Sequence, residues 1–298
     1  MGRDWDSFVP GPNIWNEIMR CTQPEGHILS FSGTRTYDLM VAAMDIAAEK
    51  HDCKLSGYHA WCYGSGFPKS MNIGKSIEAK IKTGSSSPRG QRMAAMGTDY
   101  EPSPMAGTPG YGTEGNRGTA CQPNTNSKPM ELTEDEAIKW AGYGTALKPA
   151  HEPVAEYVKG GGAKLQPESL FHYVPKPGTK ERDLGCKNLY WKQEGLDTQP
   201  ITKDEYEKFK DMDEHRVLRG NVWPTVKPIE LMRRLIRMAK RPGQKNVILE
   251  PFMGSGTTII AALLEGCDYV GIDADPVAFK IASARVRYFK CLGEFALK

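Results

Sequence analysis

The feature that most constrains this chain is a short stretch near its C-terminal end. An apolar run at 246–249 leads into a turn at 250–258, and an apolar helical pattern follows at 259–264. Glycines in such a turn permit positive φ and let a ligand approach the backbone closely. The next helix directs free N–H groups and the positive end of its dipole at that ligand. The stretch therefore predicts a strand–turn–helix unit that holds a cofactor.

A second predicted strand, 269–272, ends in an acid, Asp273. An acid about 20 residues beyond the first glycine, at the tip of the next strand, is placed to bind an adenosine ribose. The turn is not a G-x-G-x-x-G sequence, because Thr257 and Thr258 directly follow Gly256. No Gly-Lys-Ser/Thr follows it either. The pattern therefore disfavours both a dinucleotide fingerprint and a phosphate loop.

The segment upstream of the turn narrows the class of protein. Residues 221–228 and 250–258 resemble motifs X and I of amino-methylating DNA methyltransferases, usually written N-x-H-P-T-x-K-P and D-P-F-x-G-S-G-T-T. Residues 271–276 resemble motif II. This order, with motifs X and I towards the C-terminus, is that of the permuted β class. Two positions depart from the pattern: Trp223 stands where His is usual, and Glu250 stands where Asp is usual.

The rest of the chain carries weaker likenesses to the same family. Residues 26–35 are similar to its next core strand and loop. Residues 61–70 and 140–153 are similar to segments found in phage and bacterial members. The resemblance covers most of the chain outside 80–135 and 160–215.

The resemblance implies an α/β, Rossmann-like methyltransferase fold with a doubly wound sheet, and a cofactor outside the carboxyl ends of its strands. It implies S-adenosyl-L-methionine as cofactor, double-stranded DNA as partner, and methylation of adenine N6 or cytosine N4. No metal is needed, because the sulfonium of the methyl donor already carries a positive charge. By motif match, the expected cofactor-binding residues are Glu250, Pro251, Phe252, Gly254, Ser255, Gly256, Thr257 and Asp273, with Thr225, Lys227 and Pro228 on the motif X side. Lys69 and Ser70 are the candidate substrate contacts.

One expected motif is absent. The family's catalytic loop reads D/N/S-P-P-Y/F/W, and this chain contains no Pro-Pro dipeptide. In relatives that loop lies just before a segment resembling residues 1–6, so we expect the catalytic residues upstream of Met1 and a fold incomplete at the N-terminus. A second polypeptide that supplies the strand, or a decayed gene, are the alternatives. The alternative function is a catalytically silent module that binds cofactor or DNA, and methylation of RNA or protein nitrogen is a third hypothesis.

The motifs also suggest how the chain is organised. Residues 1–64, 140–160 and 216–298 are expected to form the methyltransferase core. Residues 65–139 are rich in Gly, Ser, Pro, Thr and Asn, which predicts a loop-rich insertion. Its basic first half either contacts DNA phosphates or is a solvated loop. Residues 161–215 are the candidate target-recognition region. Its aromatic residues either face DNA or form a small satellite core: Phe171, Tyr173, Tyr190 and Trp191.

Composition sets outer limits. The net charge of +3 means that nucleic-acid binding must come from local patches. Seven cysteines without a C-x-x-C pair favour a reducing compartment over a disulfide framework or zinc cluster. No apolar run long enough for a membrane span and no signal-peptide pattern is present. The expected location is the cytoplasm of a bacterium or of a phage-infected host.

Overall fold

The structure is a computed structural model that describes residues 9–64, 72–83, 133–143, 150–194, 197–212 and 216–296. The chain divides into two compact units. One contains residues 1–9 and 66–150, and the other contains residues 10–65 and 151–298. The larger unit therefore holds most of the predicted core together with the predicted target-recognition region.

The described part of the smaller unit consists of two helices, α3 (Ile73–Thr83) and α5 (Glu134–Lys139). They cross closely at Gly74, where an added Cβ would lie 2.6 Å from the carbonyl oxygen of Ala137. The prediction that 65–139 is loop-rich does not hold for these two helices. Isoleucines spaced four residues apart along α3 supply a helical stripe that the surrounding glycine- and serine-rich composition obscured.

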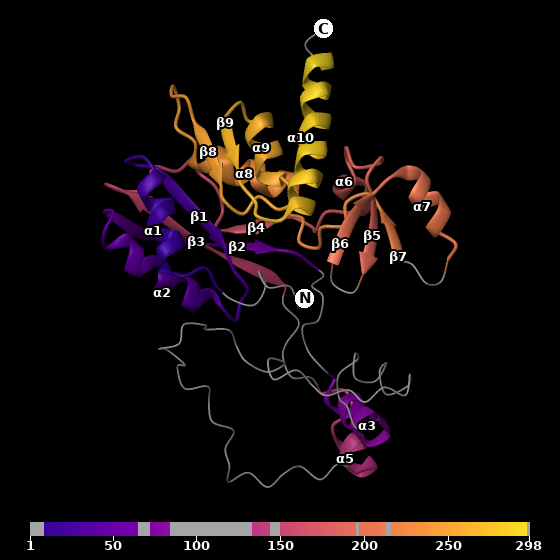
Figure 1. The fold of residues 1–298 in the computed structure, drawn as a ribbon. Helices are drawn as coiled ribbons and strands as arrows, with labels where there is room; N and C mark the ends of the chain where they lie inside the picture. The colour runs from indigo at the N-terminus through magenta and orange to yellow at the C-terminus, as the bar shows by residue number, and fades with distance from the viewer. Residues whose placement is uncertain are drawn as a thin grey trace. The chain divides into compact units, whose positions relative to one another are not determined.

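The largest sheet of the other unit has four strands in the order β1-β3-β2-β4 (Figure 1). These are β1 (His27–Phe31), β2 (Cys53–Cys62), β3 (His151–Lys159) and β4 (Phe171–Tyr173). β3 lies between β1 and β2 and is antiparallel to both, while β4 is parallel to β2. β2 and β3 pair along most of their length, from Cys53 opposite Lys159 to Cys62 opposite His151.

Two amphipathic helices, α1 (Pro12–Cys21) and α2 (Tyr37–Ala48), precede and follow β1 and pack on each other. Polar contacts tie them to β3. The hydroxyl of Tyr157 donates to Asp45 Oδ1 at 2.6 Å, and the ammonium of Lys159 donates to the carbonyl of Met19 at 2.8 Å.

The C-terminal part of the larger unit supplies a strand–helix–strand unit. β8 (Val247–Glu250) and β9 (Asp268–Gly271) are parallel neighbours, and α9 (Thr257–Leu264) connects them. One hydrophobic cluster joins this unit, through α8 (Ile229–Ala239), to the four-stranded sheet. Its buried members include Trp61 on β2 and Tyr63 just after it, Leu231 and Leu235 from α8, and Ala261 and Ala262 from α9. This arrangement confirms the predicted α/β fold.

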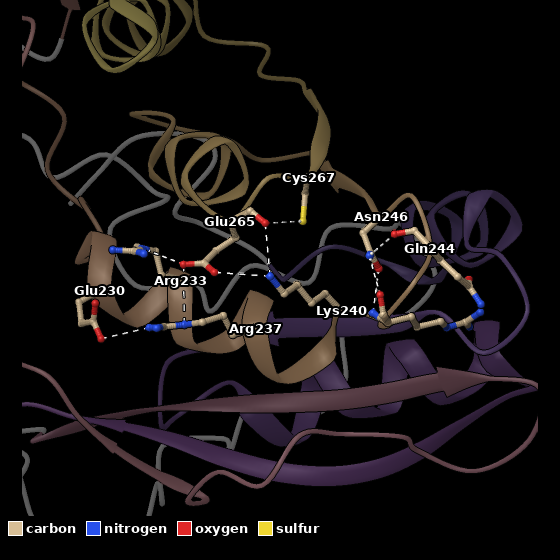
Figure 2. Close-up of polar contacts among 9 residues, drawn as sticks. Glu230, Arg233, Arg237, Lys240, Gln244, Asn246, Glu265 and Cys267 are labelled. Atoms are coloured by element: carbon tan, nitrogen blue, oxygen red, sulfur yellow. Dashed lines mark hydrogen bonds and ion pairs between the residues drawn. The ribbon is translucent and has the colours of Figure 1, made fainter. Parts of the chain in front are cut away.

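Polar contacts on the surface of α8 reinforce this junction (Figure 2). Glu265 follows α9, and its carboxylate lies 2.6 Å from Arg233 Nε and 3.6 Å from Lys240 Nζ. Arg237 contacts both Glu230 and Glu265. These cations thus pair with acids of the chain itself and join α8 to the end of α9.

A second sheet has three strands in the order β6-β5-β7, formed by β5 (Tyr190–Glu194), β6 (Asp197–Ile201) and β7 (Arg216–Arg219). Two short helices flank it: α6 (Thr179–Arg182) and α7 (Lys203–Phe209). Trp191 is fully buried and donates to the carbonyl of Gly220 at 2.8 Å. The satellite-core prediction is therefore right for Trp191, whereas Phe171 and Tyr173 on β4 are exposed.

The long helix α10 (Pro276–Ala296) packs against α9, and its first turns join a cluster with Trp191 and Trp223. None of the described helices is both long and apolar enough to cross a membrane. Among the described strands, β1 pairs only with β3, and β8 pairs only with β9. Each therefore has one edge without a hydrogen-bonded neighbour strand in this part of the chain.

Candidate cofactor site

The centre of the site is the turn between β8 and α9, which we call the 254–256 turn. Gly254 has φ of +51° and Gly256 has φ of +75°, and Gly256 is the N-cap of α9. Left-handed backbone of this kind strongly favours glycine. The turn is closed by a hydrogen bond from the Gly256 N–H to the carbonyl of Met253, at 2.8 Å. The predicted strand–turn–helix is confirmed, and two of its glycines are required by conformation.

Close packing is a second reason for these glycines. A Cβ on Gly254 would lie 2.8 Å from Nε1 of Trp223, and a Cβ on Gly256 would lie 2.8 Å from Cβ of Ala282. Trp223 is the residue that departs from the motif X pattern, and it is almost fully buried. The indole therefore forms a wall against the 254–256 turn.

Asp273 reaches the turn from the end of β9. Its Oδ2 accepts from the N–H of Gly254 at 2.7 Å, and its Oδ1 accepts from the N–H of Asp275 at 2.9 Å. The carboxylate thus holds the turn in place. Each carboxylate oxygen has capacity for a second hydrogen bond, so the expected contact with ribose hydroxyls stays a prediction.

Glu250, at the end of β8, is bonded locally. Its Oε2 accepts from the hydroxyl of Thr258 at 2.8 Å, and its Oε1 accepts from the N–H of Phe252 at 3.2 Å. Burial raises the pKa of Glu250, while these bonds and the charge of Lys227 act in the opposite direction. A cationic group beside this carboxylate would favour its ionised form.

The motif X segment contributes a lysine that faces the four-stranded sheet. The ammonium of Lys227 lies 2.7 Å from Glu152 Oε2 and 4.8 Å from the ring centroid of Phe31. Pro228 is the N-cap of α8 and is buried, whereas Thr225 is exposed. The segment therefore links the sheet to the strand–helix–strand unit, and the predicted contacts of these residues with a cofactor stay predictions.

Sequence reasoning missed one charged residue of the site. Arg285 is completely buried, and its Nη1 donates to the carbonyl of Ser255 and to the hydroxyls of Ser255 and Thr257. The available signal was an arginine four residues after the buried Ile281, on the apolar stripe of a helix.

The structure brings together the residues predicted at the turn and Asp273. The predicted substrate contacts are not among the residues that it describes. Lys69 and Ser70 lie outside the described residues. Within the described ranges, no group of three or more His, Cys, Asp or Glu side chains is arranged to hold a metal ion.

Comparison with known proteins identifies the family. A family model described as DNA methylase, of the N6/N4 methyltransferase type, matches residues 115–284, which is more than half of the chain. The chain belongs to the N6/N4 DNA methylase family. The match includes the motif X segment, the 254–256 turn and Asp273, so the resemblance of these motifs is confirmed.

Individual relatives match the chain over shorter stretches. The chain is 29% identical over 114 residues to the type II methyltransferase M.BglI of Bacillus subtilis, covering 34% of this chain and 30% of the relative. It is 43% identical over 63 residues to the type II methyltransferase M2.DpnII of Streptococcus pneumoniae, covering 21% of this chain and 23% of the relative. The chain thus spans less than a third of the length of these curated relatives.

A solved structure of an M1.HpyAVI–SAM complex is 13% identical, with a TM-score of 0.47 over 92% of this chain and 81% of the solved chain. The family assignment of the chain comes from the match to the family model.

Proposed function

We propose that this DNA methylase binds S-adenosyl-L-methionine at the 254–256 turn and transfers its methyl group to an exocyclic amino group of DNA, adenine N6 or cytosine N4. The observation that carries the proposal is the geometry of the turn. Two left-handed glycines shape the backbone of the turn at the N-terminus of α9, and Asp273 accepts from the N–H of Gly254. Such a turn favours a ligand that packs closely on the backbone.

The proposed roles follow from charge and position. The cofactor supplies a methyl group that is already activated on a sulfonium. Asp273 would accept from the ribose hydroxyls with the lone pairs that the backbone leaves unused. Glu250 would receive the cationic amino group of the methionine part, which would offset the pKa increase that burial causes in this carboxyl. Pro251, Phe252 and Ser255 would complete the pocket, with Thr225, Lys227 and Pro228 on its other side.

The DNA-binding part of the proposal rests on regions away from the turn. The basic half of the predicted insertion is outside the described residues, apart from Lys75, Lys80 and Lys82 on α3, which are exposed. Within the candidate target-recognition region, exposed Phe171 and Tyr173 on β4 are available for contact with bases.

Titration calorimetry tests the pocket. We expect S-adenosyl-L-methionine to bind the folded wild-type protein. Asp273→Ala should weaken binding by roughly 1–3 kcal/mol, because it removes charge-assisted hydrogen bonds at the turn. Asp268→Ala is the matched control, since Asp268 is exposed at the opposite end of β9 and pairs with Lys245. No heat with a folded wild-type protein would refute the cofactor assignment.

Tritiated-methyl transfer tests the chemistry. Label should enter double-stranded DNA, and mass spectrometry of the hydrolysed DNA then distinguishes N6-methyladenine from N4-methylcytosine. Label in RNA or protein, with none in DNA, would replace the DNA substrate by one of those classes.

A second candidate function is a module that binds cofactor or DNA without transferring the methyl group. Two observations favour it: the sequence has no Pro-Pro dipeptide, and β1 and β8 each lack a neighbour along one edge within the described strands. Cofactor binding without any label on DNA would support this function for the chain as it stands. Label on DNA from this chain alone would exclude it.

A further inference from the structure

The arginine beneath the 254–256 turn is in an unusual position for a charged residue. Arg285 lies on the buried face of α10, in line with Ala278, Ile281 and Ala282, and none of its surface is exposed. Removing a guanidinium from water without a carboxylate partner costs several kcal/mol. An apolar residue would fit this stripe at no such cost, so packing alone does not account for the arginine.

The bonds that Arg285 makes all end in one place. Its Nη1 lies 2.7 Å from the carbonyl oxygen of Ser255, 3.1 Å from Ser255 Oγ and 3.0 Å from Thr257 Oγ1. Within the described residues, its Nε and Nη2 have no hydrogen-bond partner. The guanidinium therefore interacts with the 254–256 turn and the first residue of α9.

The loop at 185–186 packs against α10 at this position. Gly185 has φ of +79°, and an added Cβ would lie 2.7 Å from the carbonyl oxygen of Ala284 and 3.1 Å from Cα of Arg285. Cys186 is fully buried, and burial raises the pKa of its thiol to about 11. The thiol is therefore neutral at ordinary pH and does not balance the charge of the arginine.

Nearby carboxylates are bonded elsewhere. Glu181 accepts from the N–H of Ile229 at 2.7 Å, and Asp183 accepts from the N–H of Asn221 at 2.8 Å. Both act on Arg285 through charge, without a described ion pair. Burial remains the main influence on Arg285 and lowers its pKa.

The turn is thus held from two sides. Asp273 accepts from the N–H of Gly254, and Arg285 donates to the carbonyl of Ser255. These two bonds fix the peptide group that precedes Gly254 and the one that precedes Gly256, so the turn is fixed at each of its two left-handed glycines. We propose that Arg285 is a positioning residue that holds the 254–256 turn in its ligand-binding conformation. The identity of the ligand rests on the function proposed above.

A first experiment measures the affinity for S-adenosyl-L-methionine by calorimetry. Arg285→Met keeps much of the volume and removes the donors, and we expect its Kd to rise about tenfold or more, as for lost charge-assisted hydrogen bonds. Arg285→Lys keeps one charged donor and should restore part of the affinity. Arg287→Met is the matched control, because Arg287 is an exposed arginine two residues along the same helix, and its Kd should equal that of the wild type.

Variants on the acceptor side cover the case in which Arg285→Met does not fold. Ser255→Ala and Thr257→Val each remove one hydroxyl acceptor and leave α10 intact. In the otherwise wild-type protein, each of these substitutions should raise the Kd. In a double variant that also carries Arg285→Lys, each should raise the Kd little further, because groups that act together have non-additive effects. Fully additive effects, or a folded Arg285→Met protein with the wild-type Kd, would overturn the proposal.

A second experiment needs no ligand, and it separates this proposal from the proposed function. Hydrogen–deuterium exchange should be faster at the amides of 254–257 in Arg285→Lys or Arg285→Met than in the wild type, with no change in Arg287→Met. If the wild type binds no S-adenosyl-L-methionine, the function fails while this measurement still decides the role of Arg285. Unchanged exchange at the turn would refute that role.

Discussion

Two fully buried charged groups in the same unit have different surroundings. Glu156 lies on β3 in the four-stranded sheet, and Arg285 lies under the 254–256 turn. Both carboxylate oxygens of Glu156 accept from imidazoles at 2.8 Å, one from His27 on β1 and one from His59 on β2. Among the residues that the structure describes, Arg285 is bonded only through Nη1, and all three acceptors belong to the turn and the residue that follows it.

The electrostatics of the two groups differ accordingly. Burial by itself would raise the pKa of Glu156, but the hydrogen bonds from His27 and His59 outweigh it and lower this pKa to about 2. Gly57 leaves space for the carboxylate, since an added Cβ would lie 3.0 Å from Glu156 Oε2. For Arg285, burial dominates and lowers the pKa. Glu156 thus has a hydrogen-bond donor on each carboxylate oxygen and stabilises the sheet. Arg285 has no comparable counter-charge, and its hydrogen bonds fix the shape of the turn.

The largest expected effect breaks the network in the sheet. Glu156→Ala leaves two buried imidazoles without their shared acceptor, and removing one partner of such a pair typically costs about 3–5 kcal/mol. Urea denaturation should show a loss of unfolding free energy of this size, while the Kd for S-adenosyl-L-methionine of the folded fraction stays unchanged. A loss below about 1 kcal/mol would show that Glu156 contributes no more to stability than a member of an exposed pair.

The pH dependence of stability sharpens the same contrast. The pKa of Glu156 is about 2 in the folded protein against 4.5 as its ordinary value, so the stabilisation is fully present above pH 4.5. It is lost as pH falls from there towards 2, by about 3 kcal/mol in total. The unfolding free energies of the wild type and of Glu156→Gln, measured by urea denaturation at a series of pH values, should approach each other as pH falls over this range, because the amide does not titrate. A difference in unfolding free energy that stays constant over this range would contradict the low pKa of Glu156.

A smaller effect is expected at the turn. Gly254→Ala forces a side chain into left-handed backbone and places its Cβ against Trp223, at a cost of roughly 1–3 kcal/mol. Thermal unfolding should detect this loss, and calorimetry should show a raised Kd for S-adenosyl-L-methionine. Gly243→Ala is the matched control, because Gly243 also has positive φ but nothing lies near its added Cβ. Its strain should reduce stability without changing the Kd, and a Kd equally raised in both variants would mean that the turn plays no special part.

The smallest effect concerns the surface network of α8 in Figure 2. Glu265 is nearly buried, but its partner Arg233 is about one-third exposed, so solvent screens the pair. Glu265→Gln should therefore lower the unfolding free energy by about 1 kcal/mol, measured by urea denaturation. Glu230→Gln, which removes a more exposed acid of the same network, should cost less. A larger loss for Glu230→Gln than for Glu265→Gln would show that depth of burial does not set the contribution of these pairs to stability.

Local structure was largely predictable. The strand before the 254–256 turn, the helix after it and the next strand, which ends just before Asp273, all form close to the expected residues. Their apolar periodicity and the glycines of the turn are properties of neighbouring residues. The helices α3 and α5 were not predicted, because both lie in a segment dominated by polar and small residues.

The sequence by itself determined the strand–turn–helix, its left-handed glycines and the acid at the end of the next strand, because these requirements are local to the backbone. The tertiary structure alone decided which groups hold the turn. Arg285 reaches Ser255 across 30 positions in the chain, Asp273 takes the N–H of Gly254, and Trp223 forms the wall beside it. It also paired Glu156 with His27 across 129 positions. Hydrogen bonds of buried charged groups depend on which elements pack together, and no periodicity in the sequence encodes that choice.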